Sequence, residues 1–164
     1  MSIPTPADLS GRRRILVADE DPKIVEFIIL SLRQDGHAVF YAYDGLSAAE
    51  LAFALDAVHL VISNTRVQGL PGVELIYMLR ARLPHLPIMY IANIDRSTPA
   101  IEDKLPRDVP ILREPFTAEQ LRGLVNQLLA GKPSLLDIGR LGASSPPESQ
   151  PGSPLSPPGS SLDS

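Results

Sequence analysis

Five short apolar segments alternate with amphipathic segments between residues 12 and 131, and this alternation constrains the fold more than any other feature. The apolar segments are RILVA (14–18), AVFYA (38–42), HLVIS (59–63), IMYIA (88–92) and VPIL (109–112). Their apolar residues run consecutively, which is typical of parallel strands covered on both faces. We therefore predict a doubly wound α/β fold with a five-stranded parallel sheet in three layers.

Helix start and stop signals follow each predicted strand. Asp21 and Pro22 form a capping carboxylate followed by proline at the first helical position, and this helix is predicted to end near Gln34, before Gly36. A capping-box pattern at Thr117 and Gln120 starts the last helix, which ends at Gly131. Further helices are predicted over 46–55, 73–83 and about two turns within the proline-limited segment 98–110.

The composition divides the chain into four parts. Residues 1–11 are predicted to be a flexible leader, 12–131 the domain, and 132–141 a linker. Residues 142–164 consist mostly of Pro, Ser and Gly, and the scarcity of core-forming residues predicts a disordered tail. Within the linker, SLLDIGRL (134–141) is weakly amphipathic, and packing against the domain is left open.

The charge and cysteine content exclude several classes of function. The formal net charge is −4 and no basic face is evident, which argues against nucleic-acid binding. No cysteine is present, so disulfides and thiol chemistry are excluded. No apolar run approaches the roughly 20 residues of a membrane span, and the N-terminus lacks the apolar core of a signal peptide. We predict a cytoplasmic protein that contacts neither nucleic acid nor membrane.

Polar residues stand at the predicted strand ends, where ligands bind in doubly wound folds. Asp19 and Glu20 follow the first strand, Asn64 the third, Asn93 the fourth and Glu114 the fifth. An aspartate in the place of Asn64 could be a nucleophile or a metal ligand. The sequence therefore predicts a functional edge whose central residue is an asparagine.

Four stretches together resemble the receiver domain of two-component response regulators, over about residues 13–131. They are ILVADEDP (15–22), LVISNTRVQGLPGVEL (60–75), PIMYIA (87–92) and EPF (114–116). The resemblance implies the (βα)5 flavodoxin-like receiver fold and a role in bacterial signalling. It also implies a cis peptide bond between Glu114 and Pro115.

The resemblance places the family's functional groups on named residues. The magnesium-binding acids correspond to Asp19 and Glu20, and the phosphoacceptor aspartate corresponds to Asn64. The other three family groups are replaced: the hydroxyl residue by Ala92, the lysine by Glu114 and the switching aromatic residue by Ile111.

These replacements are chemically consistent with one another. The carboxamide of Asn64 is neutral and weakly nucleophilic, Ala92 has no hydroxyl, and Glu114 places negative charge where an anion needs a positive one. The neighbours Arg113 and Asn93 are expected to point away from the pocket, because successive strand side chains face opposite sides.

The two carboxylates that follow the first predicted strand could bind a cation. We expect no required cofactor, but weak Mg²⁺ binding by Asp19, Glu20 and the backbone carbonyl of Arg66, the ligand that the resemblance implies. Glu114 could supply a third carboxylate if it reaches across the pocket. Asp21 is interpreted as a helix cap, and Asn64 as a residue that satisfies loop backbone groups.

The preferred function is a stand-alone pseudo-receiver that is not an enzyme and acts as a phosphorylation-independent adaptor. Its partner would be a signalling protein such as a kinase, another regulator or a scaffold, bound near the last two strands and helices. Two alternatives remain open: a phosphorelay receiver that uses another carboxylate such as Asp19, and a D-x-D phosphatase that uses Asp19 and Asp21.

Overall fold

The computed structural model describes residues 12–55, 57–65 and 67–131, and these form a five-stranded parallel sheet flanked by helices. The predicted leader, linker and tail lie outside the described residues. The elements follow in the order β1 (Arg14–Ala18), α2 (Pro22–Arg33), β2 (Ala38–Ala42), α3 (Gly45–Ala54), β3 (Leu60–Asn64), α4 (Gly72–Arg82), β4 (Ile88–Ala92), α5 (Pro99–Glu102), β5 (Ile111–Arg113) and α6 (Ala118–Leu129).

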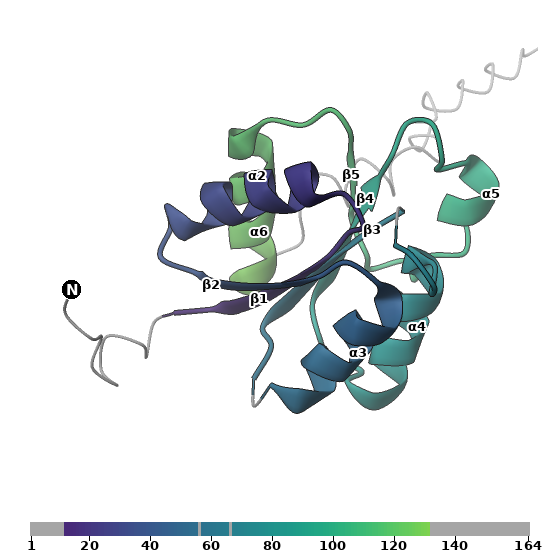
Figure 1. Cartoon of the computed structure of the whole chain (residues 1–164), viewed down its shortest axis with the longest axis horizontal. Coiled ribbons are helices and arrows are strands. Elements are labelled where there is room, and N and C mark those ends of the chain that lie inside the picture. The colour runs from purple at the N-terminus through teal and green to yellow at the C-terminus, as the bar shows by residue number, and fades with distance from the viewer. Residues whose placement is uncertain (1–11, 56, 66, 132–164) are drawn as a thin grey trace, which may run out of the picture.

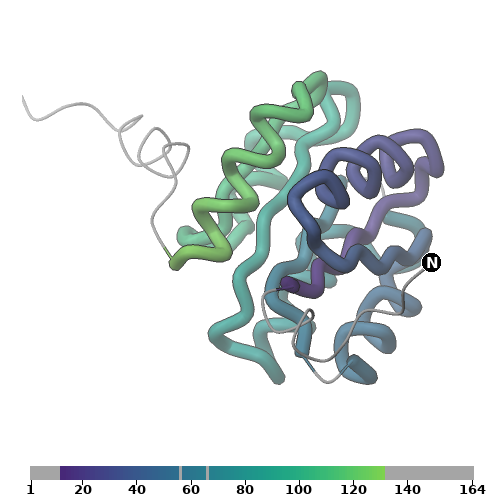
Figure 2. Tube along the Cα trace, turned by 90° about the vertical axis from the view of Figure 1, so that its left-hand side faces the viewer, coloured from purple at the N-terminus to yellow at the C-terminus, as the bar shows by residue number. Residues whose placement is uncertain are grey.

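The sheet has the strand order β2-β1-β3-β4-β5, and every neighbouring pair is parallel. Helices α2 and α6 cover one face, and α3 and α4 cover the other (Figure 1; Figure 2). Each face buries its own apolar cluster, one including Ile15, Ile62 and Leu121, the other including Leu16, Val61 and Leu79. The predicted doubly wound, three-layer fold is confirmed.

The helix starts follow the predicted capping chemistry. The Asp21 carboxylate accepts a hydrogen bond from the Lys23 backbone N–H at 2.9 Å, so Asp21 caps α2. Thr117 and Gln120 bond each other's backbone N–H groups and form the capping box of α6. Gly36, with a φ of 83°, adopts the left-handed conformation just after α2 that glycine tolerates best.

Several boundaries differ from the sequence prediction, and α3 and α4 each lie one residue earlier than predicted. Strand β3 is shifted by one residue and includes Asn64, which pairs with Ile91 of β4. Strand β5 starts at Ile111 instead of Val109; Pro110, which has no N–H to donate, precedes it. Helix α5 has one turn instead of two: it ends at Glu102, and turn residues follow before Pro106.

The start of α4 packs tightly against the end of β3. A Cβ atom on Gly72 would lie only 2.3 Å from the carbonyl oxygen of Asn64, a distance that real Cβ atoms do not reach. The Ser63 hydroxyl also donates to the Gly72 carbonyl at 3.2 Å. This close approach of helix to strand fixes the backbone of Asn64 at the carboxyl edge of the sheet.

Candidate functional site at the carboxyl edge of the sheet

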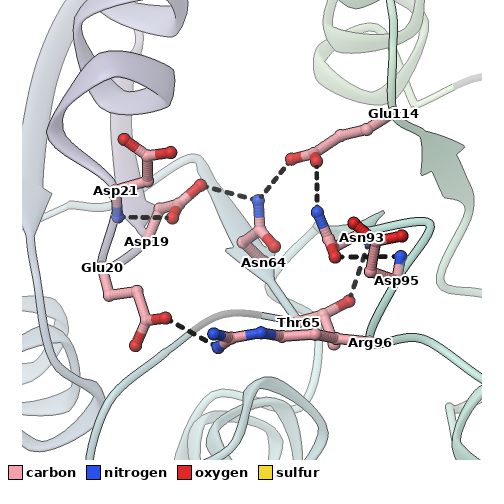
Figure 3. Close-up of polar contacts among 9 residues, drawn as sticks. All are labelled: Asp19, Glu20, Asp21, Asn64, Thr65, Asn93, Asp95, Arg96 and Glu114. Carbon is pink, nitrogen blue, oxygen red and sulfur yellow. Dashed lines mark hydrogen bonds and ion pairs between the residues drawn. The ribbon is translucent and has the colours of Figure 1, made fainter.

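Side chains from four strand ends converge at the carboxyl edge of the sheet (Figure 3). Asp19 follows β1, Asn64 ends β3, Asn93 follows β4 and Glu114 follows β5. Asp19, Asn64 and Asn93 expose 0%, 1% and 2% of their surface, and Glu114 is half-buried. The structure brings these four strand-end residues together at one edge of the sheet.

The side-chain amide of Asn64 bridges two carboxylates. Its Nδ2 atom donates to Asp19 Oδ2 at 2.6 Å and to Glu114 Oε1 at 3.1 Å (Figure 3). An amide nitrogen carries two N–H donors, so these two bonds use both of them. Asn64 therefore links β1 to β5 through the pocket.

The orientation predicted for Asn93 is wrong. Its Nδ2 atom donates to Glu114 Oε2 at 2.7 Å, and its Oδ1 atom accepts from the Asp95 backbone N–H at 3.1 Å. Strand β4 ends at Ala92, so the alternation of strand side chains does not extend to Asn93. The following turn aims its amide into the pocket, where Glu114 accepts a hydrogen bond on each carboxylate oxygen.

Burial is the main determinant of the ionisation of Asp19. Desolvation raises its pKa from an ordinary 3.8 to about 7, and the nearby negative charge of Glu114 adds to the increase. The backbone N–H of Asp21, 2.9 Å from Asp19 Oδ1, and the Asn64 amide oppose it by favouring the charged form. Asp19 therefore titrates near neutral pH in the folded protein.

Glu20 lies apart from this cluster. Its carboxylate accepts a hydrogen bond from Arg96 at 2.8 Å and forms an ion pair on the outer side of the site (Figure 3). Arg66, whose carbonyl was the third predicted magnesium ligand, lies outside the described residues.

The side chains present would have to exchange their present partners to hold a magnesium ion. In the described part of the chain, no group of three or more His, Cys, Asp or Glu side chains is placed to hold a metal. An amide N–H donor of Asn64 points at Asp19 Oδ2, the oxygen that would have to face a cation. Weak magnesium binding by Asp19 and Glu20 therefore stays a prediction, and no chemical step is assigned to it.

The remaining positions singled out in the sequence have structural surroundings. Ala92 is buried in the apolar cluster beneath α3 and α4, and Ile111 packs against the same cluster. Arg113 faces away from the pocket, as predicted, and donates to both carboxylate oxygens of Glu102 at 2.7 and 2.6 Å. The peptide bond between Glu114 and Pro115 is cis.

A pair of hydroxyl groups next to the site was not predicted. Thr65 Oγ1 lies 2.7 Å from the Tyr90 hydroxyl and 3.0 Å from the Ile91 carbonyl, and it accepts a bond from the Asn93 backbone N–H at 3.2 Å. Tyr90 stands inside an apolar run and reads in the sequence as a core residue. Only the pairing of β3 with β4 brings its hydroxyl to Thr65.

The fold and this strand-end site together define a protein class. Residues 15–126 match the model of the response regulator receiver domain family, and the chain belongs to that family. It is therefore a receiver domain of two-component signalling, as the sequence resemblance implied. Among the described residues, no helix combines the length and apolar character needed to cross a membrane.

Known proteins resemble this chain over the same region. The response regulator FleR of Pseudomonas aeruginosa is 30% identical over 119 residues, which cover 73% of this chain but only 25% of FleR. The receiver protein CpdR of Brucella abortus is 28% identical over 116 residues, covering 71% of this chain and 93% of CpdR. The crystal structure of a receiver protein from Sinorhizobium medicae superposes with a TM-score of 0.67 at 27% identity, covering 73% of this chain and 96% of that one.

Proposed function

We propose that this receiver domain acts in two-component signalling without accepting a phosphoryl group, as a module that binds a protein partner. One observation carries the proposal: Asn64 stands where the resemblance places the phosphoacceptor aspartate, and its amide is bonded to the carboxylates of Asp19 and Glu114. A carboxylate oxygen can attack phosphorus, whereas a carboxamide is neutral and its nitrogen lone pair is delocalised. In this pocket the amide is also engaged as a donor on both sides.

The electrostatics around Asn64 support the same proposal. A phosphoryl group needs positive charge or hydrogen-bond donors directed at its oxygens. Here the carboxylates of Asp19 and Glu114 face the space beside Asn64, and the methyl group of Ala92 replaces a hydroxyl donor. The donors Asn64 Nδ2 and Asn93 Nδ2 are already bonded to these carboxylates.

A protein-binding role is supported by the region between β5 and α5. The double hydrogen bond from Arg113 to Glu102 joins β5 to α5, and the Ser97 hydroxyl, in the loop before α5, donates to the same carboxylate at 2.8 Å. Charge-assisted paired bonds of this kind fix orientation as well as distance. A surface held in one arrangement suits an adaptor whose partner, a kinase, another regulator or a scaffold, recognises a constant shape.

The two alternatives have less support. For a phosphorelay through Asp19, the nucleophile would be a side chain with no exposed surface, with hydrogen bonds on both carboxylate oxygens. For a D-x-D phosphatase, the second acid would be Asp21, which caps α2. We therefore propose that the domain is not an enzyme.

Incubation with acetyl phosphate, with and without Mg²⁺, followed by intact-mass measurement tests the absence of phosphoryl transfer. We expect no added phosphoryl group on the natural chain. The matched control is the triple variant Asn64→Asp, Ala92→Thr, Glu114→Lys, which supplies the acceptor, the hydroxyl and the cation together and should be labelled. Stoichiometric labelling of the natural chain, mapped to Asp19 or Asp21, would overturn the proposal.

The adaptor role needs its own measurement. Affinity capture from extract of the native cell should retain the same signalling partner with and without acetyl phosphate. The Arg113→Glu variant, which breaks the bond to Glu102, should retain less of the partner. The control Arg107→Glu makes the same change of charge at an exposed residue that does not contact Glu102, and it should retain as much partner as the natural chain. A partner that binds only after acetyl phosphate treatment would contradict this role.

A further inference from the structure

A second pocket, of about 670 Å³, opens at the amino ends of the strands, opposite the site described above. Its lining includes residues that directly precede β1, β3 and β4, namely Arg13, His59 and Pro87. Five-residue strands place it about 16 Å from Asn64. An apolar lining comes from Phe53, Val58, Leu83, Leu86 and Leu129.

The walls of this pocket are fixed by hydrogen bonds. Arg80 Nε donates to the Leu86 carbonyl at 2.9 Å, and the same guanidinium is paired with Asp108 at 2.8 Å, which holds the loop between α4 and β4. The Arg14 backbone N–H donates to His59 Nδ1 at 2.9 Å. The pocket is therefore preformed, and an occupant would not have to order its walls.

Two arginines give the pocket a positive rim. Arg82 stacks over the Phe53 ring, with 4.1 Å between the guanidinium carbon and the ring centroid, and Arg13 lies on the same lining. Within the described ranges neither is in an ion pair, whereas Arg80, Arg96, Arg113 and Arg122 each have a carboxylate partner. No described lining residue is acidic. The pocket therefore favours an apolar segment that carries a negative charge.

The chain itself supplies such a segment close by. Leu129, the last residue of α6, lines the pocket, and residues 132–164, outside the described ranges, continue from there. The stretch SLLDI (134–138) has three large apolar residues and one carboxylate, Asp137. The four residues from Gly131, the last described residue, to Leu135 span up to about 14 Å, so Leu135 can reach a pocket that Leu129 lines.

We propose that residues 134–138 dock into this pocket, with Leu135 and Leu136 on the apolar lining and Asp137 beside Arg82 and Arg13. The short connection raises the effective concentration of the segment at the pocket, as for other tethered binding elements. Docking would cover the amino ends of the strands and leave the carboxyl edge with Asn64 free. It stands independently of the proposed function, because it involves the opposite end of the sheet.

Amide NMR spectra of the full chain test the apolar contacts. In the double variant Leu135→Asp, Leu136→Asp, the amide signals of Val58, Leu83 and Leu86 should move away from their natural positions. The matched control Leu155→Asp, Leu162→Asp makes the same change in the same tail, and it should leave these signals in place. Spectra in which both variants give the natural positions would overturn the proposal, and so would equal shifts in both.

A charge exchange tests the polar contact. Arg82→Glu should shift the signals of Ser134 and Leu135, which are not adjacent to either substitution, and adding Asp137→Arg to the same chain should restore at least half of that shift. Arg107→Glu, which reverses an exposed charge away from the pocket, is the control and should have no effect on these signals. Failure of Asp137→Arg to restore them would overturn the placement of Asp137 beside Arg82.

Discussion

The amide of Asn64 and the carboxylate of Asp19 form a 2.6 Å hydrogen bond in which neither side chain exposes more than 1% of its surface. A hydrogen bond to a charged acceptor is stronger than a neutral one, and leaving either group buried without a partner is costly. The bond joins the ends of β1 and β3. It lies where the receiver family, by resemblance, uses an aspartate and a cation.

Replacing Asn64 by aspartate should destabilise the domain without creating a good phosphoacceptor. The change removes the donor between Asp19 and Glu114 and adds a third carboxylate, and like charges about 4 Å apart repel by about 1 to 4 kcal/mol. We expect Asn64→Asp to lower the free energy of unfolding by about 2 kcal/mol at pH 8, with a smaller loss at pH 5. Urea denaturation at the two pH values measures both losses.

The control for this substitution is Gln68→Glu, which adds the same charge at an exposed residue outside the site, in a backbone bridge with Asp44. Its effect on the free energy of unfolding should stay within about 0.5 kcal/mol. Efficient acetyl phosphate labelling of Asn64→Asp alone would show that the missing hydroxyl and lysine matter less than the pocket geometry indicates.

The stability of the protein should fall as the pH rises toward neutrality. Asp19 has a pKa of about 7 when folded and an ordinary value of 3.8. Between these values the folded state binds more protons than the unfolded state, so the free energy of unfolding decreases with rising pH and levels off above pH 7. A pKa difference of this size corresponds to about 4 kcal/mol.

The Asp19→Asn variant isolates this contribution. The pKa of His59 is also lowered, mainly by burial, so its titration makes the free energy of unfolding rise with pH over part of the same range. This rise is the same in the natural chain and in Asp19→Asn, and it cancels in the difference between them. The difference between the natural chain and Asp19→Asn should therefore change by a few kcal/mol between pH 4 and 8 in urea denaturation. A pH-independent difference would show that Asp19 is already ionised at pH 5.

Breaking the link between β5 and α5 should loosen α5. Arg113→Met keeps the apolar stem but removes both bonds to Glu102; because the Arg113 side chain is 66% exposed, we expect a cost of only about 1 kcal/mol. Hydrogen exchange of the Ile101 and Glu102 amides should accelerate several-fold. Arg107→Met is the matched control, and equal exchange in both variants would contradict a fixed α5.

Magnesium should bind weakly, with a dissociation constant on the order of 1 mM, which corresponds to about 4 kcal/mol. Glu20 is held by Arg96 and the Asn64 amide faces Asp19, so both carboxylates are engaged. Arg96→Gln releases Glu20 and should tighten binding several-fold in an NMR titration of the Asp19 and Glu20 amides. Arg107→Gln should not. Micromolar affinity in the natural chain would contradict this expectation.

Part of the site could be predicted because strand ends are marked by local sequence. The apolar runs predicted the order of the strands, the Asp21-Pro22 cap and the Thr117 capping box predicted the starts of α2 and α6, and parallel strands bring their carboxyl ends to one edge. Asp19, Asn64 and Glu114 were placed together on that basis. The absence of a nucleophilic carboxylate at Asn64 was also readable from the sequence, because it depends only on residue type.

The orientations of side chains were decided by tertiary structure. Asn93 turns into the pocket because β4 ends one residue earlier, and Glu20 turns out of it because Arg96, 76 positions away in the chain, meets it. The raised pKa of Asp19 likewise depends on burial by several elements at once and on Glu114 across the pocket. The sequence by itself determined the order of the elements and the chemistry available at each strand end, since these follow from local patterns. Only the packed structure decided which groups face one another, because those contacts join residues far apart in the chain.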